Sequence, residues 1–387
     1  MKLFKYKKCK LFIQLFIIFL PYIFSCVRLN LSPNDLSNEY NKIERYLKEC
    51  NSFKHFIPKQ SSILENPKIS IITPVYNTGK FILRLLRSIQ YQNFKSLEII
   101  LIDDFSKDNS VQLIKKYQKE DRRIRLITNK KNKGTFSCRN IGIMKSKGYY
   151  IFLPDSDDIL LENSLNHFYN FAIKNNYEFV RFNAYLHYGR SFFGGITQQL
   201  KSRPIYQPEL STYIFYGLGY LLQIDYNTWN KIIKRETLIK VLNTIDNIYL
   251  TMYMTCHEDG LLNYMIYRIA KSSYFSKRFG YYYIRNNYKH RKNYYNFNNM
   301  KFSFIHIMNV FNYTKNTKYE KDMTNEIFKR LIYRKKIKNR LHLFNKEFNF
   351  FISAIDILNN NEFFLNKYKR YLNDFKKYFR LLMKKKI

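Results

Sequence analysis

The chain has 387 residues, of which 46% are hydrophobic, enough apolar content to build one large globular domain or two domains. Lysine and arginine outnumber aspartate and glutamate by 67 to 29, a balance that would favour nucleic acid or an anionic membrane surface as a partner. Lys, Asn, Ile, Tyr and Phe are over-used together, as a base-composition bias would produce, so we interpret most of the lysine excess as solvated surface. Neither an RNA-binding stacking motif nor a zinc-finger spacing accompanies the charge, and we predict no nucleic-acid partner.

The N-terminus has the pattern of a targeting segment. Five lysines within the first ten residues precede an uncharged apolar stretch from Leu11 to Val27. Its length falls between a signal peptide and a short membrane-spanning helix, and Ile23-Phe24-Ser25 is a poor cleavage site. We therefore predict that residues 1–27 are an uncleaved signal anchor in a membrane of the secretory pathway, endoplasmic reticulum or Golgi, with a lumenal catalytic domain. Secretion after signal cleavage is the alternative.

Residues 28–66 are polar and interrupted by Ser, Asn and Pro, which is typical of a stem, with one short helix around Tyr40 to Glu49. From Lys68, apolar runs with strand character alternate with helical patterns. This alternation predicts a parallel sheet with right-handed crossovers. The expected strands are Ile69–Thr73, Leu97–Ile102, Ile124–Thr128 and Tyr149–Leu153, and the expected helices are Lys80–Gln92, Ser110–Glu120, with Asp108 as its cap, and Thr135–Ser146.

The pattern becomes mixed between about residues 160 and 285. We expect helices starting at Leu161 and Leu261, and loops or short antiparallel strands from Gly189 to Gly195. Beyond Asn286 the chain is rich in Lys, Asn and Phe, and its long helical stretches predict a basic helical C-terminal region. That region either rests on anionic lipid head groups or is a solvated appendage.

Carboxylates cluster after two of the predicted strands. Asp103 and Asp104 follow one strand, and Asp155-Ser156-Asp157-Asp158 follows another. If the two strands are adjacent and parallel, their C-terminal ends place these carboxylates in one crevice, where open α/β sheets bind ligands. Hard carboxylate oxygens suit Mg²⁺ or Mn²⁺, and no His or Cys cluster competes for zinc. The pattern thus indicates a metal–diphosphate site.

The acidic run after the second of these strands, and two other groups of residues that are considered below as candidate site residues, also have a purely structural interpretation. Asp157 and Asp158 could be acids at the N-terminus of the helix expected from Leu161, and Glu258 and Asp259 could do the same at the next helix. Tyr76 could be a packed aromatic residue at a strand end.

The chain resembles the family 2 glycosyltransferases, inverting enzymes with a nucleotide-diphospho-sugar-binding fold called GT-A. The resemblance is dense over residues 68–160 and thinner over 225–285. It implies an α/β fold with a Rossmann-like, mostly parallel sheet, helices on both faces, a nucleotide-sugar-binding half (67–160) and an acceptor half (161–285). The motifs that carry it, in family order, are Thr73-Pro74-Val75-Tyr76-Asn77, Asp103-Asp104, Asn132-Lys133-Gly134, Arg139-Asn140 with Gly142, and Asp155-Ser156-Asp157.

The resemblance implies a nucleoside-diphosphate sugar as donor, with uridine as the base, and a role for each motif. Asp104 is similar to the acid that reads the base, with Asp103 in support, and Arg139 lies near the base or phosphate. The first acid of the metal motif faces the ribose and the second coordinates Mn²⁺ or Mg²⁺, which neutralises the departing diphosphate. The implied nucleotide-sugar-binding residues are Pro74, Tyr76, Asn77, Asp103, Asp104, Asn132, Gly134, Arg139, Asn140, Asp155 and Ser156, and the implied metal ligands are Asp155 and Asp157.

His257-Glu258-Asp259-Gly260 resembles the Glu-Asp signature of the family. We predict Asp259 as the general base that takes the proton of the acceptor hydroxyl, with Glu258 as a supporting acid. Processive synthases of the family carry a Gln-x-x-Arg-Trp motif, which cannot exist here because Thr228 precedes the only tryptophan, Trp229. The expected activity is therefore non-processive transfer of a hexose or N-acetylhexosamine to a hydroxyl of a glycan, protein or lipid.

Two features depart from the family pattern. Phe105 replaces the glycine that is common after the paired acids, and residues 161–226 offer no match to an acceptor-binding region. Three alternatives to the enzyme remain open: a catalytically inactive GT-A module that binds glycan or a partner glycosyltransferase, a nucleotidyltransferase, and a basic scaffold on membranes. The nucleotidyltransferase is disfavoured because the loop after the first strand has a single glycine, Gly79.

Overall fold

The structure is a computed structural model. It describes residues 65–79, 81–188, 191–196, 202–207, 227–245, 250 and 258–285, together with Asn41, Arg45 and Lys48. The chain divides into two compact units, residues 1–295 and 296–387, and every element below belongs to the first. The predicted anchor, nearly all of the predicted stem and the predicted basic C-terminal region lie outside the described residues. No helix formed by the described residues is long and apolar enough to cross a membrane.

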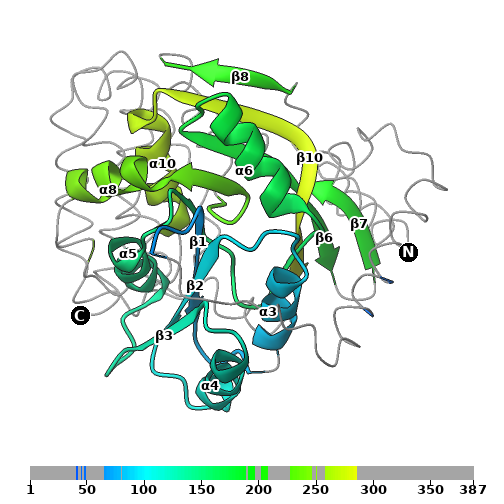
Figure 1. The fold of residues 1–387 in the computed structure, drawn as a ribbon, viewed down its shortest axis with the longest axis vertical. Helices are drawn as coiled ribbons and strands as arrows, with labels where there is room; N and C mark the ends of the chain where they lie inside the picture. Colours follow the sequence, from blue (N-terminus) through cyan, green and yellow to red (C-terminus); the bar gives the residue numbers. More distant parts are fainter. Residues whose placement is uncertain are drawn as a thin grey trace, which may run out of the picture. The chain divides into compact units, whose positions relative to one another are not determined.

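The first half of the fold is a parallel sheet with the strand order β3-β2-β1-β4. Every residue of β2 is buried, as expected for a parallel strand covered on both faces. Right-handed crossovers place α3 and α4 on one face of the sheet and α5 on the other (Figure 1). These elements are β1 (Ile69–Val75), α3 (Ile82–Gln90), β2 (Leu97–Asp103), α4 (Ser110–Glu120), β3 (Ile124–Thr128), α5 (Thr135–Lys145) and β4 (Tyr150–Phe152).

The two acid-bearing strands, β2 and β4, are parallel but not adjacent. β1 lies between β2 and β4 and pairs in parallel with both. Both acidic groups still follow strands that run in the same direction, so they lie at the same edge of the sheet, one strand apart. The predicted cap of α4 is also shifted: Asn109 is the N-cap, and Asp108 accepts a hydrogen bond from the Ser110 backbone at 3.0 Å.

The second half extends the sheet with mostly antiparallel pairs. The order continues from β4 through β9, β6 and β10 to β5, with β7 paired to β6 and β8 paired to β10. The antiparallel pairing of β7 with β6 confirms the short strands expected around residues 189–195. The elements are β5 (Ile159–Leu160), α6 (Ser164–Lys174), β6 (Phe179–Tyr188), β7 (Ser191–Ile196), β8 (Arg203–Tyr206), β9 (Lys231–Lys234), α8 (Arg235–Thr244), α10 (Glu258–Ile269) and β10 (Ser272–Arg285).

The helix expected from Leu161 begins at Ser164 because a short strand comes first. β5 follows the acidic run directly and pairs with β10. Asp157 and Asp158 therefore do not open a helix, and the capping interpretation of these acids is wrong. α10 begins at Glu258, three residues before the expected start, so Glu258 and Asp259 do occupy the first turn of a helix.

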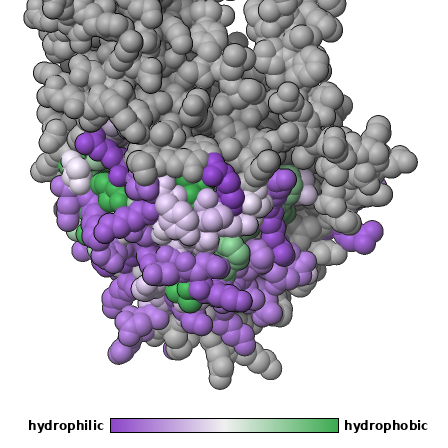
Figure 2. All heavy atoms as spheres, turned by 90° about the horizontal axis from the view of Figure 1, so that it is seen from above, coloured by the Kyte–Doolittle hydropathy of each residue, from purple (hydrophilic) through white to green (hydrophobic). Residues whose placement is uncertain are grey.

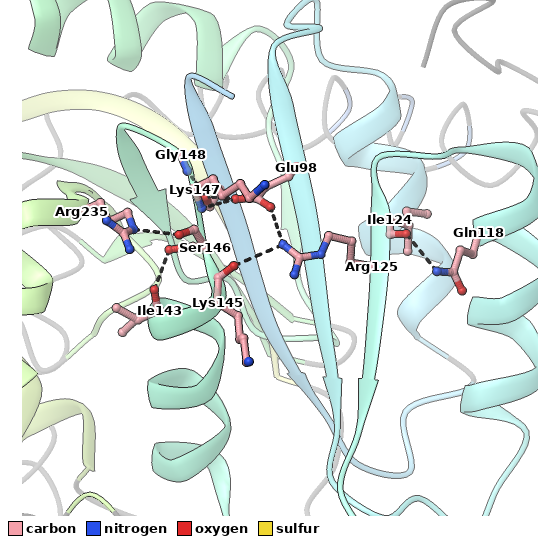
Figure 3. Close-up of polar contacts among 11 residues, drawn as sticks. Glu98, Gln118, Ile124, Arg125, Ile143, Lys145, Ser146, Lys147, Gly148 and Arg235 are labelled. Carbon is pink, nitrogen blue, oxygen red and sulfur yellow. Dashed lines mark hydrogen bonds and ion pairs between the residues drawn. The ribbon is translucent and has the colours of Figure 1, made fainter. Parts of the chain in front are cut away.

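The turn between α5 and β4 is fastened to the starts of β1 and β2. The Glu98 carboxylate accepts hydrogen bonds from Ser70 Oγ and from the Lys147 backbone, both at 2.6 Å, and pairs with Arg125 at 2.9 Å. Arg125 also donates to the Lys145 carbonyl oxygen at 3.2 Å (Figure 3). This network fixes the C-terminal end of α5 against the sheet.

The surface seen in Figure 2 is mainly hydrophilic over its described part, and the apolar residues on it are scattered. Scattered apolar residues are usual on a protein surface. Tyr76 and Phe105 are among the exposed large hydrophobic residues of the described part of the chain, at 50% and 40% exposure. They stand just beyond the C-terminal ends of β1 and β2, at the edge where the acidic groups gather.

Candidate active site

The loops after β1 and β2 are joined by Asn77. Its backbone N–H donates to Ser106 Oγ at 3.0 Å, and its side-chain oxygen accepts from the Lys107 backbone at 2.8 Å. The backbone of Asn77 has φ 53°, a left-handed conformation that asparagine tolerates better than most residues. The two residues predicted to bind the ligand therefore have different roles. Asn77 holds two loops together, whereas Tyr76 is half exposed and accessible to a ligand.

Asp104 anchors the loop that leads into α5. Its two carboxylate oxygens accept hydrogen bonds from Asn129 Nδ2 at 2.9 Å and from the Lys133 and Gly134 backbones, both at 2.8 Å. Its exposure is only 3%. These contacts give Asp104 a structural role. To bind the nucleotide base as well, Asp104 would have to keep these hydrogen bonds at the same time. Asp103 accepts from the Ser106 backbone at 3.3 Å.

The turn into α5 depends on a glycine. Gly134 has φ 84°, where a side chain would be strained, and its N–H also donates to Asn132 Oδ1 at 3.1 Å. The predicted Asn132 and Gly134 therefore set the start of the helix that carries Arg139.

Phe105 occupies the left-handed position for which glycine is the usual residue. Its φ is 69°, so the turn after the paired acids is kept in spite of the substitution. The ring remains 40% exposed, and the Lys107 ammonium lies 3.4 Å from its centroid. This cation–π contact accounts for part of what holds an unfavourable conformation in place.

Arg139 is the centre of the candidate site. Its side chain is almost fully buried, forms ion pairs with Asp155 at 2.7 Å and with Asp259, and donates a hydrogen bond to Glu258 at 3.5 Å. Burial opposes its charge, but Asp259 and Asp155 hold the pKa of Arg139 above its ordinary value. One guanidinium thus connects the predicted metal motif with the predicted catalytic acids. Asp259 comes 120 residues after Arg139 in the sequence.

Two of the acids around Arg139 have raised pKa values, and the third is partly exposed. Burial, reinforced by the charge of Asp259, raises the pKa of Glu258 to about 8, so Glu258 holds its proton at neutral pH. Burial also raises the pKa of Asp155, to about 7, against the opposing effect of Arg139. Asp259 keeps 25% of its side chain exposed and accepts a hydrogen bond from Thr228 Oγ1 at 3.1 Å. Of the two neighbours, Asp259 is the one that an acceptor could reach.

Asp158 and Tyr281 support the acids of the site. Neither was among the site residues predicted from the sequence. Asp158 is fully buried and accepts from Tyr281 Oη at 2.9 Å and from the Ile284 backbone at 2.8 Å. The Tyr281 hydroxyl in turn accepts from the Asp155 backbone at 3.0 Å. The acidic run pointed to Asp158, but no sequence signal distinguishes Tyr281 within a tyrosine-rich strand. Trp229 stacks on Tyr281 with ring centroids 4.9 Å apart and is part of this support.

The remaining predicted residues lie at the margins of the cluster. Pro74 pairs with Ile102 in the β1–β2 ladder, and Ser156 is buried beside the acids. Asn140 Nδ2 donates to the Leu250 carbonyl at 3.3 Å, and its buried Oδ1 has no partner among the described residues. His257 lies outside them.

The residues expected to hold a metal ion are Asp155 and Asp157. Within the described part of the chain, no group of three or more His, Cys, Asp or Glu side chains is arranged to hold a metal ion. Asp157 is nevertheless near enough to Asp155 for its charge to raise the pKa of that carboxyl. Mg²⁺ is commonly bound by one or two carboxylates together with substrate phosphates, and Asp155 and Asp157 offer that donor set.

Comparison with known proteins agrees with this geometry. Residues 70–242 match the model of glycosyl transferase family 2. This region belongs to that family. The family 2 match covers the parallel half of the sheet, the acidic run and β9, and it confirms the predicted family and its α/β fold.

Bacterial glycosyltransferases align with part of the chain. Glycosyltransferase GlyG of Streptococcus pneumoniae is 39% identical over 101 residues, which are 26% of this chain and 34% of that protein. The poly(ribitol-phosphate) beta-N-acetylglucosaminyltransferase TarP of Staphylococcus aureus is 40% identical over 118 residues, 29% of this chain and 35% of TarP. The first relatives found match over 17% to 44% of their own lengths.

Solved structures share the fold over a longer stretch. The crystal structure of S. aureus TarS 1-349 in complex with UDP-GlcNAc has a TM-score of 0.54 at 19% identity and covers 71% of this chain and 75% of that one. The complex of the same TarS fragment with UDP has a TM-score of 0.52, also at 19% identity, and covers 72% of this chain and 75% of that one. Both show likeness of fold.

Proposed function

We propose that this family 2 protein is an inverting, non-processive glycosyltransferase. It moves a sugar from a nucleoside-diphosphate sugar, with uridine as the base, to a hydroxyl of a glycan, protein or lipid. The observation that carries the proposal is the cluster in which Arg139 bridges Asp155 and Asp259, a donor-side acid and an acceptor-side acid. The names of TarP, a beta-N-acetylglucosaminyltransferase, and of the TarS complex with UDP-GlcNAc support the choice of donor.

Transfer is a single displacement at the anomeric carbon. The acceptor oxygen forms a bond to that carbon while the bond to the diphosphate oxygen breaks, and the nucleoside diphosphate leaves with the electron pair. Asp259 takes the proton of the acceptor hydroxyl. Thr228 donates to Oδ1 of Asp259, and the side chain is partly exposed. The other carboxylate oxygen can therefore accept the proton of an incoming hydroxyl.

Arg139 and Glu258 prepare Asp259 for this task. Arg139 fixes the carboxylate and keeps positive charge beside the acids, and Glu258, protonated at neutral pH, adds no second negative charge. A low-dielectric site makes such preorganised charges more effective than they would be in water.

A divalent cation is part of the proposal. Asp155 and Asp157 would hold Mn²⁺ or Mg²⁺, and the ion would neutralise charge on the diphosphate of the leaving group. We further propose that the apolar segment before residue 28 attaches the protein to a membrane of the secretory pathway.

The proposal is tested by incubating the full-length protein with a panel of nucleoside-diphosphate sugars and Mn²⁺ and measuring the release of nucleoside diphosphate. We expect one donor to release its nucleoside diphosphate. Asp259→Asn should slow release by about a hundredfold or more, because the general base is lost, while nucleotide binding persists. Asp157→Ala should abolish the part of nucleotide binding that needs Mn²⁺.

The matched control is Glu236→Gln, which removes an exposed acid on α8 and should leave release unchanged. Full activity in Asp259→Asn would contradict the assignment of the base. Metal-dependent nucleotide binding without release from any donor or added acceptor would favour the inactive GT-A module instead.

A further inference from the structure

A groove of about 430 Å³ lies along one face of α6, outside the acidic cluster. This volume is within the range of roughly 300–1,000 Å³ that is usual for small-molecule sites. It is lined by asparagine amides, two aromatic rings and two cationic side chains. The lining residues are Asn163, Asn166, His167, Asn170, Phe171, Lys174 and Arg278.

Two aromatic rings, those of His167 and Phe171, are among the residues that line the groove. The rings of His167 and Phe171 stack with centroids 6.4 Å apart and planes inclined by 17°. Burial, together with the charge of Arg278, lowers the pKa of His167, so its ring is neutral at pH 7. An apolar ring face flanked by hydrogen-bonding groups is a surface on which the carbon face of a sugar can rest.

The asparagines offer hydrogen bonds beside this surface. Asn163 is the N-cap of α6, and Asn166 and Asn170 lie one turn apart on the helix. Each amide has two donor hydrogens and an acceptor oxygen. Asn170 donates to Asn166 Oδ1 at 2.9 Å and Asn163 donates to Glu162 at 3.4 Å, which leaves most of this capacity for a ligand. Paired donors and acceptors of this kind match the hydroxyl groups of a saccharide.

The charge of the groove selects among saccharides. Lys174 and Arg278 both line it, and neither forms an ion pair with a described residue. The Arg278 guanidinium is close enough to affect the ionisation of His167. Two cationic side chains in a groove whose other lining residues are neutral favour a ligand with a phosphate or carboxylate group.

Both elements that form the groove also reach the acidic cluster. α6 follows the acidic run after β5, with only five residues from Asp158 to Asn163. β10 carries Arg278 in the groove and, three residues later, Tyr281 against Asp155 and Asp158. Three residues of strand span about 10 Å.

We propose that this groove binds an anionic saccharide and thereby holds the acceptor chain of the enzyme. The asparagines bind its hydroxyls, the His167–Phe171 surface receives a sugar ring, and Lys174 with Arg278 binds its phosphate or carboxylate. This inference rests on the proposed function, because it assigns the acceptor class to the same enzyme.

Calorimetric titration of the full-length protein, without donor or metal, tests the inference with three probes. They are isomaltohexaose, its phosphorylated derivative and a hexamer of galacturonate. We expect one or both anionic probes to bind and the neutral probe to bind at least about tenfold more weakly. The double variant Lys174→Gln/Arg278→Gln should weaken anionic binding by about tenfold or more, and Asn166→Ala should weaken it less.

The control is Lys115→Gln/Lys116→Gln, which removes two exposed charges from α4 and should change nothing. Equal losses in both double variants would overturn the site in favour of general charge attraction. Equal binding of the neutral probe would overturn the anionic preference, and no binding of any probe would overturn the inference altogether. Donor hydrolysis, measured on the same protein preparations after addition of donor and Mn²⁺, separates the two proposals: hydrolysis without saccharide binding rejects only the groove, and binding without hydrolysis rejects only the enzyme.

Discussion

At the scale of single residues, the site is governed by an imbalance of charge around Arg139. One guanidinium faces three carboxylates, from Asp155, Glu258 and Asp259. Ionising all three would bury more negative charge than one cation can compensate, so the protein keeps Glu258 protonated. The excess of negative charge is also the basis for proposing that Asp155 and Asp157 bind a cation.

The protonation of Glu258 has a measurable effect on stability. Because its pKa is raised to about 8 in the folded state, against about 4.3 for a free glutamate, the folded state binds the extra proton between these values. The stability of the wild type relative to Glu258→Gln should therefore fall as the pH rises from 5 to 8, and level off above that. Urea unfolding at a series of pH values measures the difference. Glu236→Gln, at an exposed ion pair, should show no such trend over the same range, and a flat difference for Glu258→Gln would refute the raised pKa.

At the scale of elements, α5 positions Arg139 by packing closely on β1. A Cβ atom at Gly142 would overlap with Ile72 Cγ2 and lie 2.9 Å from Ile102 Cδ1. The glycine therefore brings the middle of the helix down onto the sheet, while the Glu98 network holds its C-terminal end. The position of Arg139, one turn before Gly142, follows from these two constraints.

Gly142→Ala should destabilise the protein in spite of the better helix propensity of alanine. The propensity gain is about 1 kcal/mol, whereas an added methyl in a tightly packed core costs about 1–3 kcal/mol. We expect a net loss of stability in chemical denaturation and, because Arg139 moves with the helix, a larger loss of sugar transfer. Gln112→Ala on the exposed face of α4 is the control and should be nearly neutral. Equal or greater stability in Gly142→Ala would mean that α5 can shift away from β1 without cost.

The elements also show how far the sequence determines the prediction. Local periodicity was sufficient for β1 to β4 and α3 to α5, because each of the first three strands is followed by a helix that leads to the next strand. It was insufficient from residue 160 on, because β6 pairs with β10 and β4 with β9, partners that are far apart in the sequence. The same limit applies to the site. Arg139, Asp155 and Asp259 were predicted separately, but spacing alone does not reveal that one guanidinium joins them.

At the scale of the whole molecule, the two acidic groups and the catalytic acids lie on different segments of one sheet edge. A ligand that contacts several of them should stabilise the folded chain by mass action. Metal and nucleotide should act together, because the cation is proposed to be shared between Asp157 and the diphosphate.

Mn²⁺ and UDP added together should raise the melting temperature by several degrees, more than the sum of their separate effects. A ligand at about 100 times its Kd contributes roughly 2.7 kcal/mol, which corresponds to some 2–4 °C per kcal/mol for a domain of about this size. Thermal scans with and without EDTA measure the effect. Asp157→Ala should lose the metal-dependent part and Glu236→Gln should keep it. An equal shift by UDP in EDTA would argue for metal-independent binding.

The place of Tyr281 near the end of the described chain bears on biosynthesis. Chains are made from the N-terminus, and their N-terminal parts fold first. The loops proposed to bind the donor are complete once α5 and β4 have formed, but the proposed general base, Asp259, and the tyrosine that supports Asp155 come after residue 257. A partly synthesised chain could therefore carry a sheet with nucleotide-binding loops and still be inert. We expect activity to begin only when β10, the last strand of the described residues, has left the ribosome and inserted between β6 and β5.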